Sequence, residues 1–318
     1  MVIHRYFCQF VPSDIETALG LRYIIAAEIG GGGQGAVFKA TRISCPDGTP
    51  VNDVVALKMH FDRRKNSLIQ PEITATENFS HPSLARLIEY GYCDVSGRHT
   101  RYAAWEFIQG QPLSVLLQNG PLLESEVLAI GRDVCTAIAQ VWSRHMVHGD
   151  VKPSNIMVRS SDGHITLDSV DSAVLIDLGA ARYLDQHNTR SLRPSRDLDQ
   201  HDRRAPYRPF GTWGYFSPEQ IKGVKALTCA SDIFSLGVVL LQCLLGRHPT
   251  DYDQAALADG LRASGGRLAA SEGLLSTLDS MLSPVPASRP NPADLSHRFQ
   301  SLRQTMQAAF YKGDRPPT

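Results

Sequence analysis

Strand-like and helix-like patterns of apolar residues occupy different parts of this chain. Short runs rich in β-branched and aromatic residues, typical of strands, fall mainly before residue 110. Apolar residues three or four positions apart, typical of helices, dominate after it. Strands are predicted in 22–58, 84–90, 101–105, 156–158 and 173–176. Helices are predicted at 67–79, 113–118, 124–146, 231–245, 253–263, 271–282 and 293–308.

The length of the chain bears on its number of domains, and its charge bears on the partners that it could bind. A chain of 318 residues is long for one hydrophobic core and indicates two lobes or domains. The formal net charge is zero, from 32 basic and 32 acidic residues, so it gives no argument for binding nucleic acid or an anionic membrane. The arginine-rich stretch 180–210 is interleaved with acidic residues, which weakens its interpretation as a nucleic-acid patch.

The cysteines and the apolar stretches bear on location. The six cysteines are scattered without a CxxC or CxxxC pair, which argues against structural disulfides or a zinc site and fits a reducing compartment. The first residues lack the basic head and apolar run of a signal peptide. The longest apolar stretch, Ile233–Leu245, is too short to span a bilayer. We therefore expect a cytoplasmic protein with no membrane segment in this chain.

One short loop concentrates groups that can carry chemistry. Asp150, Lys152 and Asn155 lie within six positions, and Pro153 among them shapes the segment as a loop. An apolar helix-like run precedes this loop and a strand-like run follows it, which is where catalytic groups are usually placed. Asp177 comes later, directly after the apolar run 173–176. An acid that can take a proton, with an Asn and an Asp that can hold Mg²⁺, is suited to phosphoryl transfer.

A glycine-rich turn near the start of the chain is a candidate phosphate loop. Gly30, Gly32 and Gly35 have the spacing G-x-G-x-x-G, and Val37 follows. Glycines let backbone N–H groups approach phosphate oxygens without a Cβ in the way. The motif alone is weak, because a glycine run can simply be a flexible hairpin. A dinucleotide fold needs a helix directly after the third glycine, but residues 36–40 alternate and favour a strand. The pattern therefore favours a hairpin over phosphates.

Lys58 interrupts the apolar run 54–59. A lysine at a strand edge is the ordinary explanation of such a position. Because it lies about twenty residues past a glycine hairpin, it can instead reach the α- and β-phosphates of a nucleotide. Glu72 can pair with it from the following helix, although Pro71 places the helix start close to Glu72. Glu77, one turn further on, is a second candidate.

The segment Glu106–Gly110 ends the strand-rich region and is interpreted as a connector. Its backbone can hydrogen-bond a flat heterocycle, and Trp105 would stand at the back of such a pocket. Packing in the core is the simpler interpretation of Trp105, and both can hold.

The order of these motifs resembles the eukaryotic-type (Hanks) protein kinase family, in particular its bacterial members. The resemblance covers about residues 22–310 and rests on several short motifs. These are the glycine loop at 30–37, Val55-Ala56-Leu57-Lys58, His81-Pro82, His148-Gly149-Asp150-Val151-Lys152-Pro153-Ser154-Asn155, Asp177-Leu178-Gly179, Gly211-Thr212, Ser217-Pro218-Glu219, Ser231-Asp232-Ile233-Phe234-Ser235-Leu236-Gly237 and Ser288-Arg289-Pro290.

The resemblance implies an α+β fold with two lobes. Residues 21–109 would form a small antiparallel β-sheet lobe with one main helix, and 110–310 a larger, mostly helical lobe. Residues 1–20 would be an N-terminal extension, and 311–318 a tail or the start of a linker.

The resemblance also implies the chemistry of the loop. Asp150 would accept or orient the proton of a Ser/Thr hydroxyl in a protein substrate, and Lys152 would steady the γ-phosphate of ATP. Asn155 and Asp177 would hold Mg²⁺. Lys58 would pair with the α- and β-phosphates. The implied contacts to ATP come from Gly30, Gly32, Gly35, Val37, Ala56, Lys58, Glu106 and Ile108, and the implied catalytic residues are Asp150, Lys152, Lys58 and its ion-pair partner Glu72.

Further residues would support this site. Glu219 would pair with Arg289, Asp232 would anchor the backbone of the catalytic loop, and Thr212 would touch that loop. Gly149 stands where many members have an arginine that binds a phosphate on the activation segment. We hypothesise that activity here does not require phosphorylation through that contact.

Two other functions remain open. His-Gly-Asp also occurs in small-molecule kinases of the aminoglycoside and choline type, but Lys152 and the segment 211–219 favour a protein substrate. A pseudokinase acting as a scaffold would lack one of the residues corresponding to Lys58, Asp150, Asn155 and Asp177, and all four are present.

Overall fold

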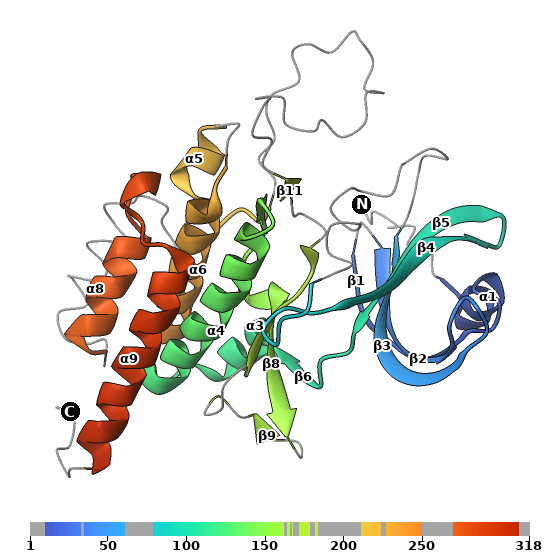
Figure 1. The fold of residues 1–318 in the computed structure, drawn as a ribbon, viewed down its shortest axis with the longest axis horizontal. Coiled ribbons are helices and arrows are strands. Elements are labelled where there is room, and N and C mark those ends of the chain that lie inside the picture. The colour runs from blue at the N-terminus through green and yellow to red at the C-terminus, as the bar shows by residue number, and fades with distance from the viewer. Residues whose placement is uncertain are drawn as a thin grey trace, which may run out of the picture. The chain divides into compact units, whose positions relative to one another are not determined.

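The computed structural model describes residues 10–32, 35–60, 79–161, 164–165, 167, 172–178, 182–183, 211–223, 227–249 and 270–311. They form two compact units (Figure 1). The first contains the described residues up to Phe79 together with Ala85–Ile108, and the second contains Ser80–Leu84 and those from Gln109 onward. Predictions outside these ranges are residues 1–9 of the N-terminal extension, the helix at 67–79 except its last residue, Glu72 and Glu77, the helix at 253–263, the tail beyond 311, and most of the stretch 180–210.

The first unit is built on a five-stranded antiparallel sheet, as the resemblance implies. Its strand order is β1-β2-β3-β5-β4, and its strands are β1 (Tyr23–Gly32), β2 (Gly35–Ser44), β3 (Pro50–His60), β4 (Leu87–Val95) and β5 (Arg98–Glu106). Neighbouring strands in the chain are joined by short turns, except β3 and β4.

The prediction for the last two strands was wrong in extent. Strands were predicted at 84–90 and 101–105, but β4 and β5 form one long hairpin closed at Ser96 and Gly97. Both turn residues have positive φ, 53° and 78°, which matches the twist of a two-residue hairpin turn. Leu84 lies outside the sheet and instead forms isolated bridges with His81 and Leu175. The Ser-Gly pair was the signal for the hairpin.

One face of the sheet is the core of the first unit. Val55, Leu57 and Met59 alternate along β3 on the buried face, so Ala56 and Lys58 lie on the opposite face. The short helix α1 (Pro12–Ala18) adds Ile15 to this core. The sequence carried little signal here because so short a helix buries a single residue.

Polar contacts tie this N-terminal segment to the sheet. The Glu16 Oε1 atom accepts a hydrogen bond from the Ile25 N–H at 2.7 Å. Arg22 Nη1 lies 2.6 Å from Glu89 Oε1 in an ion pair. Burial alone would raise the pKa of Glu89, but the hydrogen bonds from Tyr102 and Arg22 lower it below its ordinary value. Residues 10–22, which include the described part of the N-terminal extension, therefore belong to the first unit.

The second unit is mostly helical, as expected (Figure 1). Its long helices are α4 (Glu124–Trp142), α6 (Cys229–Leu245), α8 (Glu272–Met281) and α9 (Pro292–Tyr311). α4 packs against α6 and α9, and α8 packs against both α6 and α9. Shorter helices are α3 (Leu113–Leu116) and α5 (Pro218–Ile221), and 3₁₀ turns span Leu117–Asn119, Pro153–Asn155 and Pro286–Ser288. None of the helices in the described ranges is long and apolar enough to cross a membrane.

The end of α4 corrects the predicted helix 124–146. The helix stops at Trp142, and His145 takes a left-handed conformation with φ 55°. The apolar residues Met146 and Val147 continue the chain as strand β7, which pairs with β11 (Arg182–Tyr183). The helix therefore ends where the chain begins to pair with a distant segment. This end lies about one turn before the one that the local apolar periodicity predicted.

Small strands frame the segment that follows β7. β8 (Ile156–Ser161) lies between β6 (Gly110–Pro112) and β10 (Ala173–Leu175), and it forms a hairpin with β9 (His164–Ile165). The three residues of β10 are fully buried, as the apolar run predicted. The chemistry-bearing loop 148–155 thus runs from one buried strand, β7, to another, β8.

Candidate active site

The loop 148–155 is held at its start by a buried carboxylate. Asp232 on α6 accepts hydrogen bonds from the backbone N–H groups of His148 and Gly149, each at 2.8 Å. Asp232 is only 2% exposed, and burial raises its pKa above the ordinary value. The predicted anchoring of the loop backbone by Asp232 is confirmed.

His148 joins this loop to the segment that carries Asp177. Its Nε2 atom lies 3.1 Å from the carbonyl oxygen of Ile176, and its Nδ1 atom faces the N–H of Asp150 at 3.3 Å. Because Nδ1 accepts from a backbone N–H, the network assigns the proton to Nε2, which donates to Ile176. The ring is fully buried. No role of His148 was predicted from the sequence, since only the fold shows what its ring reaches.

Asp177 is positioned from both sides. The N–H of Ile176 donates to the carbonyl oxygen of Asn155 at 2.8 Å, so the loop holds the residue directly before Asp177. The following residue, Leu178, is buried. Asp177 itself has φ 62°, a left-handed conformation that is uncommon outside glycine and is found at functional sites.

The three loop residues and Thr212 form one cluster. Lys152 Nζ lies 2.7 Å from Asp150 Oδ2 and donates to Thr212 Oγ1 at 2.6 Å. Thr212 Oγ1 donates in turn to Asp150 Oδ1 at 2.9 Å. The amide of Asn155 donates to the carbonyl oxygen and to the carboxylate of Asp150, at 2.9 and 3.1 Å. The predicted contact of Thr212 with this loop is confirmed.

The contacts within this cluster orient three groups that can take part in chemistry, on Asp150, Asn155 and Lys152. Both oxygens of the Asp150 carboxylate are oriented, and its side chain is 16% exposed, so an approaching hydroxyl can reach it. Because the donors of the Asn155 amide point at Asp150, its carbonyl oxygen is the atom suited to a cation. The positive Lys152 lies beside the acid, where it can offset negative charge.

The backbone conformation at position 149 favours glycine. It has φ 77°, where a side chain would be strained. Gly211 approaches the same place, since a Cβ added there would lie 2.6 Å from the carbonyl oxygen of Gly149. Position 149 holds glycine where many members of the family have arginine. At this position the backbone of the loop packs closely against the segment that leads to Thr212.

In the first unit, strand register places the predicted nucleotide-binding residues. Gly30, Val37, Lys58 and Ala103 are successive partners across β1, β2, β3 and β5. They form one row on the face opposite the core, and Ala56 lies two residues along β3 on the same face. The structure therefore brings Lys58 next to the strand that follows the glycines.

The glycine turn is a β-hairpin, as predicted. Gly32 and Gly35 are partners at the end of β1 and β2, so a strand and not a helix follows the third glycine. A Cβ on Gly35 would collide with the carbonyl group of Met59 on β3, so glycine is needed there for close strand packing. A Cβ on Gly30 would meet only the side chain of Val37, at 3.9 Å.

The connector begins where β5 ends. Glu106 is the last residue of β5, and its N–H donates to the carbonyl oxygen of Arg86 at 2.8 Å. Lys39 Nζ lies 4.7 Å from the centre of the Phe107 ring, a cation–π contact, and Ile108 is buried. Trp105 packs against the pair Leu87 and Ala103, which supports core packing as one of its roles.

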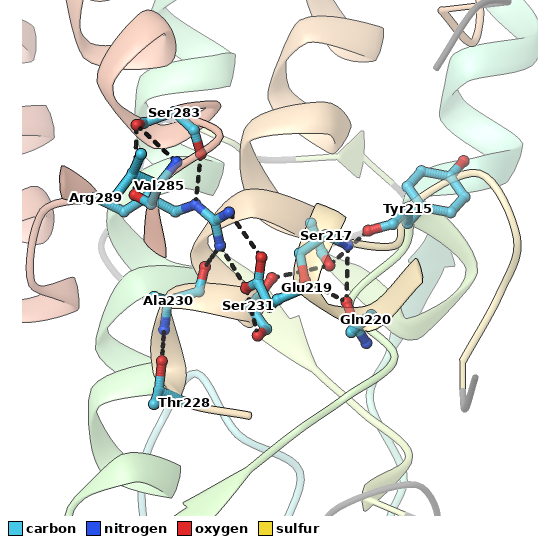
Figure 2. Close-up of polar contacts among 11 residues, drawn as sticks. Tyr215, Ser217, Glu219, Gln220, Thr228, Ala230, Ser231, Ser283, Val285 and Arg289 are labelled. Atoms are coloured by element: carbon cyan, nitrogen blue, oxygen red, sulfur yellow. Dashed lines mark hydrogen bonds and ion pairs between the residues drawn. The ribbon is translucent and has the colours of Figure 1, made fainter. Parts of the chain in front are cut away.

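A polar network fixes the segment after Thr212 (Figure 2). Arg289 donates to both carboxylate oxygens of Glu219, at 2.7 and 2.9 Å, and to the carbonyl oxygens of Ala230 and Ser283. Ser231 donates to the same carboxylate at 2.8 Å. Burial would raise the pKa of Glu219, but the hydrogen bonds from Arg289 and Ser231 lower it below its ordinary value. The predicted Glu219–Arg289 pair is confirmed.

Comparison with known proteins agrees with this geometry. A family model described as the protein kinase domain matches residues 23–300. The chain is 30% identical over 242 residues to the serine/threonine-protein kinase pkn3 of Myxococcus xanthus, covering 76% of this chain and 41% of that protein. It is 30% identical over 240 residues to the serine/threonine-protein kinase PrkC of Bacillus subtilis, covering 74% of this chain and 32% of that protein.

A third relative is the probable serine/threonine-protein kinase PknB of Lactococcus lactis, 28% identical over 235 residues, with 74% of this chain and 33% of that protein covered. The chain thus matches about a third to two fifths of the length of these curated bacterial relatives. The family match spans most of the chain, and it includes the anchored loop, the glycine hairpin and the Glu219–Arg289 pair. The chain belongs to the protein kinase family.

Proposed function

We propose that this chain transfers the γ-phosphoryl group of ATP to Ser/Thr hydroxyls of proteins, including its own chain. The observation that supports this best is the cluster of Asp150, Lys152, Asn155 and Thr212, in which an acid, a cation and an amide are held by mutual hydrogen bonds. The family match and the names of the relatives point to the same reaction.

In this proposal Asp150 orients the substrate hydroxyl and accepts its proton as the oxygen attacks phosphorus. Its carboxylate is oriented by Asn155 and Thr212, so the accepting lone pair needs little reorganisation. Lys152, already beside Asp150, steadies the negative charge of the transferring group. General acid–base catalysis by such a group contributes about 10²–10⁴-fold to the rate.

The phosphates of ATP are assigned to the first unit. Backbone N–H groups of the hairpin that carries Gly30, Gly32 and Gly35 bind the phosphates, and Lys58 pairs with the α- and β-phosphates. Val37 and Ala56 lie on the same face as Lys58 and contact the base and ribose. The backbone of Glu106 and Ile108 hydrogen-bonds the adenine. The pairing of Lys58 with Glu72 remains part of the proposal, with Glu77 as the other candidate.

Magnesium fits the donors of the second unit. The Asn155 carbonyl oxygen and the Asp177 carboxylate are hard oxygen ligands, and hydrogen bonds through Ile176 keep their backbones together. No group of three or more His, Cys, Asp or Glu side chains gathers as a metal cage in the described ranges. Two protein ligands suit Mg²⁺, which is commonly held by one or two side chains and by substrate phosphates. Bound there, the ion would neutralise charge on the phosphates.

The contacts of Lys152 favour a protein substrate over a small alcohol. Lys152 reaches Thr212, and Thr212 belongs to the segment 211–223 that the Glu219–Arg289 network holds in place. A small-molecule kinase would have no need to fix a segment beside the acid in this way. We include in the proposal the lobe boundaries 21–109 and 110–310, a cytoplasmic location, and no nucleic-acid partner.

An autophosphorylation assay with Mg²⁺ and labelled ATP tests this function. The wild-type chain and Asp279→Asn, an exposed aspartate on α8, are expected to incorporate label. Asp150→Asn and Asp177→Asn, which make the same chemical change in the site, are expected to lose it. A generic acceptor such as casein is included as a second substrate.

The outcomes separate the alternatives. Label in the wild type that persists in Asp150→Asn and Asp177→Asn would reject the assigned roles. Transfer to an aminoglycoside or choline with none to protein would favour the small-molecule kinase. Binding of ATP with no transfer to any acceptor would favour the pseudokinase scaffold.

A further inference from the structure

A buried carboxylate inside helix α4 binds the strand that leads to Asp177. Asp133 lies in the middle of α4 and is 1% exposed. Its Oδ2 atom accepts hydrogen bonds from the Ala173 N–H at 3.0 Å and from the Ser172 hydroxyl at 3.2 Å. Ala173 is the first residue of β10, and Asp177 follows the end of that strand by two positions. Asp133 therefore holds the start of the strand that delivers Asp177.

The other oxygen of this carboxylate is held by an arginine. Arg132 Nε donates to Asp133 Oδ1 at 2.7 Å, and Arg132 Nη1 donates to Gln300 Oε1 on α9 at 3.2 Å. Both charged residues are buried. A buried ion pair is weak evidence for stability, because desolvation offsets the attraction and apolar residues of similar volume often serve as well. The best-attested use of buried polar groups is to fix a register.

The apolar pattern of β10 does not specify how this strand aligns with its neighbour. Ala173, Val174 and Leu175 are all fully buried, so no alternation of apolar and polar residues distinguishes one register from the next. The structure gives the strand three residue pairs with β8. A slip by one residue would keep the strand apolar, but it would move Asp177 by about 3.4 Å along the strand.

Polar contacts on the side away from β8 select one register. β10 lies at the edge of its sheet, and the N–H groups of Ala173 and Leu175 point to the same side. The first donates to Asp133, and the second donates to the Ser83 carbonyl oxygen at 2.9 Å. In another register the buried Ser172 hydroxyl would lose its partner, and Asp133 Oδ2 would face an apolar side chain. Buried polar groups without partners are costly, so the register seen here is favoured.

On the basis of the proposed function, we propose that Asp133 is a positioning residue, which sets the register of β10 on β8 and thereby places the Asp177 carboxylate to bind Mg²⁺ with Asn155. The N–H of Ile176 donates to the Asn155 carbonyl oxygen, which holds the far end of the segment. Asp133 holds its near end. Mg²⁺ demands near-ideal octahedral geometry at about 2.0–2.1 Å, so a slip of one residue would remove the site.

Binding of Mn²⁺ to the nucleotide-free chain tests the proposal. Mn²⁺ suits the same oxygen ligands as Mg²⁺, and the EPR signal of free Mn²⁺ falls as the ion binds. Asp133→Leu removes the acceptor and should raise the Kd for Mn²⁺ about tenfold, as the loss of a group that orients a metal ligand does. The double variant Arg132→Met/Asp133→Leu replaces the ion pair by apolar side chains, which buried sites often tolerate. It should show the same increase, and it decides the question if Asp133→Leu does not fold.

Glu89→Gln is the matched control. Glu89 is also a carboxylate of low exposure that pairs with an arginine, Arg22, but it belongs to the first unit. This variant should lower the melting temperature and leave the Kd for Mn²⁺ unchanged. Turnover gives a second readout: the free Mg²⁺ concentration for half-maximal transfer should rise about tenfold in the Asp133 variants, with the KM for a peptide substrate unchanged.

The failure of this inference differs from the failure of the proposed function. An unchanged Kd for Mn²⁺ in the folded Asp133 variants would overturn it. So would an equal increase in Glu89→Gln, because Asp133 would then act only through general stability. Asp177→Asn should lose Mn²⁺ binding, and wild-type affinity in that variant would refute the metal assignment on which the inference rests. If the wild type bound Mn²⁺ through Asp177 but labelled no acceptor, the proposed function would fall and the register role of Asp133 would stand.

Discussion

Lys58 in the first unit and Asp150 in the second are positioned by different physical means. Lys58 is set by strand register, because backbone ladders with β2 and β5 fix its place opposite Val37 and Ala103. Asp150 lies in a loop without a ladder, so side chains fix it: Asp232 holds the preceding backbone, and Thr212 orients the carboxylate. The first arrangement is collective, because many backbone hydrogen bonds share it, whereas the second depends on single side chains.

This difference predicts different sensitivities. A single side chain removed from the sheet leaves its ladder intact, so the backbone must be disturbed to displace Lys58. A single carboxylate removed from the support of the loop leaves buried donors without partners, which is costly.

Asp232→Ala should have the largest effect. It removes the acceptor of two buried N–H groups, and each buried unsatisfied donor costs about 1–3 kcal/mol. The free energy of unfolding, measured by urea denaturation, should fall by the cost of two such donors. Phosphoryl transfer should be lost as well. Asp279→Ala on the exposed side of α8 is the control. Equal stability of the two variants would show that the loop does not need this anchor.

Glu219→Gln should be the next most damaging, with a dependence on pH. A hydrogen bond to a charged group contributes about 1.5–3 kcal/mol, and Glu219 makes several in the native state. Its pKa is lowered on folding, so this stabilisation is present above the ordinary pKa of a glutamate and is lost as pH falls through the lower native value.

The difference in unfolding free energy between wild type and Glu219→Gln should therefore be largest near neutral pH and shrink in acid. Urea denaturation at a series of pH values measures it. A difference that grew toward low pH would contradict the lowered pKa of Glu219.

Gly35→Ala tests the sheet. The added Cβ collides with the Met59 carbonyl group, and overpacking of this kind costs about 1–3 kcal/mol. Because β2 must shift against β3, the KM for ATP should rise as the melting temperature falls. Gly30→Ala is the matched control in the same hairpin, since its Cβ meets only Val37 at 3.9 Å. It should leave the melting temperature unchanged. Equal melting temperatures for both variants would show that the strand contact is not tight.

The smallest effect is expected from changing the Ser and Thr residues of the arginine-rich stretch 180–210. Thr189, Ser191 and Ser195 are its Ser/Thr residues between 180 and 210. With Gly149 in place of an arginine, and with Asp150 already held by Thr212, the triple alanine variant should keep the wild-type rate on a peptide substrate. Loss of activity in that variant would refute the hypothesis that the loop is ready without phosphorylation through position 149.

Much of the candidate site could be predicted from the sequence because its motifs are short and contiguous. The motifs from the glycine loop to Ser288-Arg289-Pro290 suggested the family by their number and order along the chain, and the family match agrees. Strand boundaries were less accurate. β4 and β5 extend to a Ser-Gly turn, and α4 ends early because Met146 and Val147 pair with a distant strand.

The contacts that support the site could not be deduced from local patterns. No local sequence pattern around His148 indicates that its ring reaches the Ile176 carbonyl oxygen, 28 positions away. Ile15 is the one buried residue of α1, so a local pattern says little about how this helix packs on the sheet. Trp213 is exposed although its side chain is hydrophobic. Such features depend on which distant residues fold onto a side chain.

The types and order of the reactive groups follow from the amino-acid sequence alone, and so do the kinds of elements that carry them. These follow from residue chemistry and from hydrophobic period, which are local properties. Tertiary folding brings Asp232 to the loop that it anchors, joins Thr212 and Lys152 at Asp150, and leaves Trp213 open to solvent. Hydrogen bonds and exposure depend on distances of a few ångströms between residues far apart in the chain, and no local pattern encodes those distances.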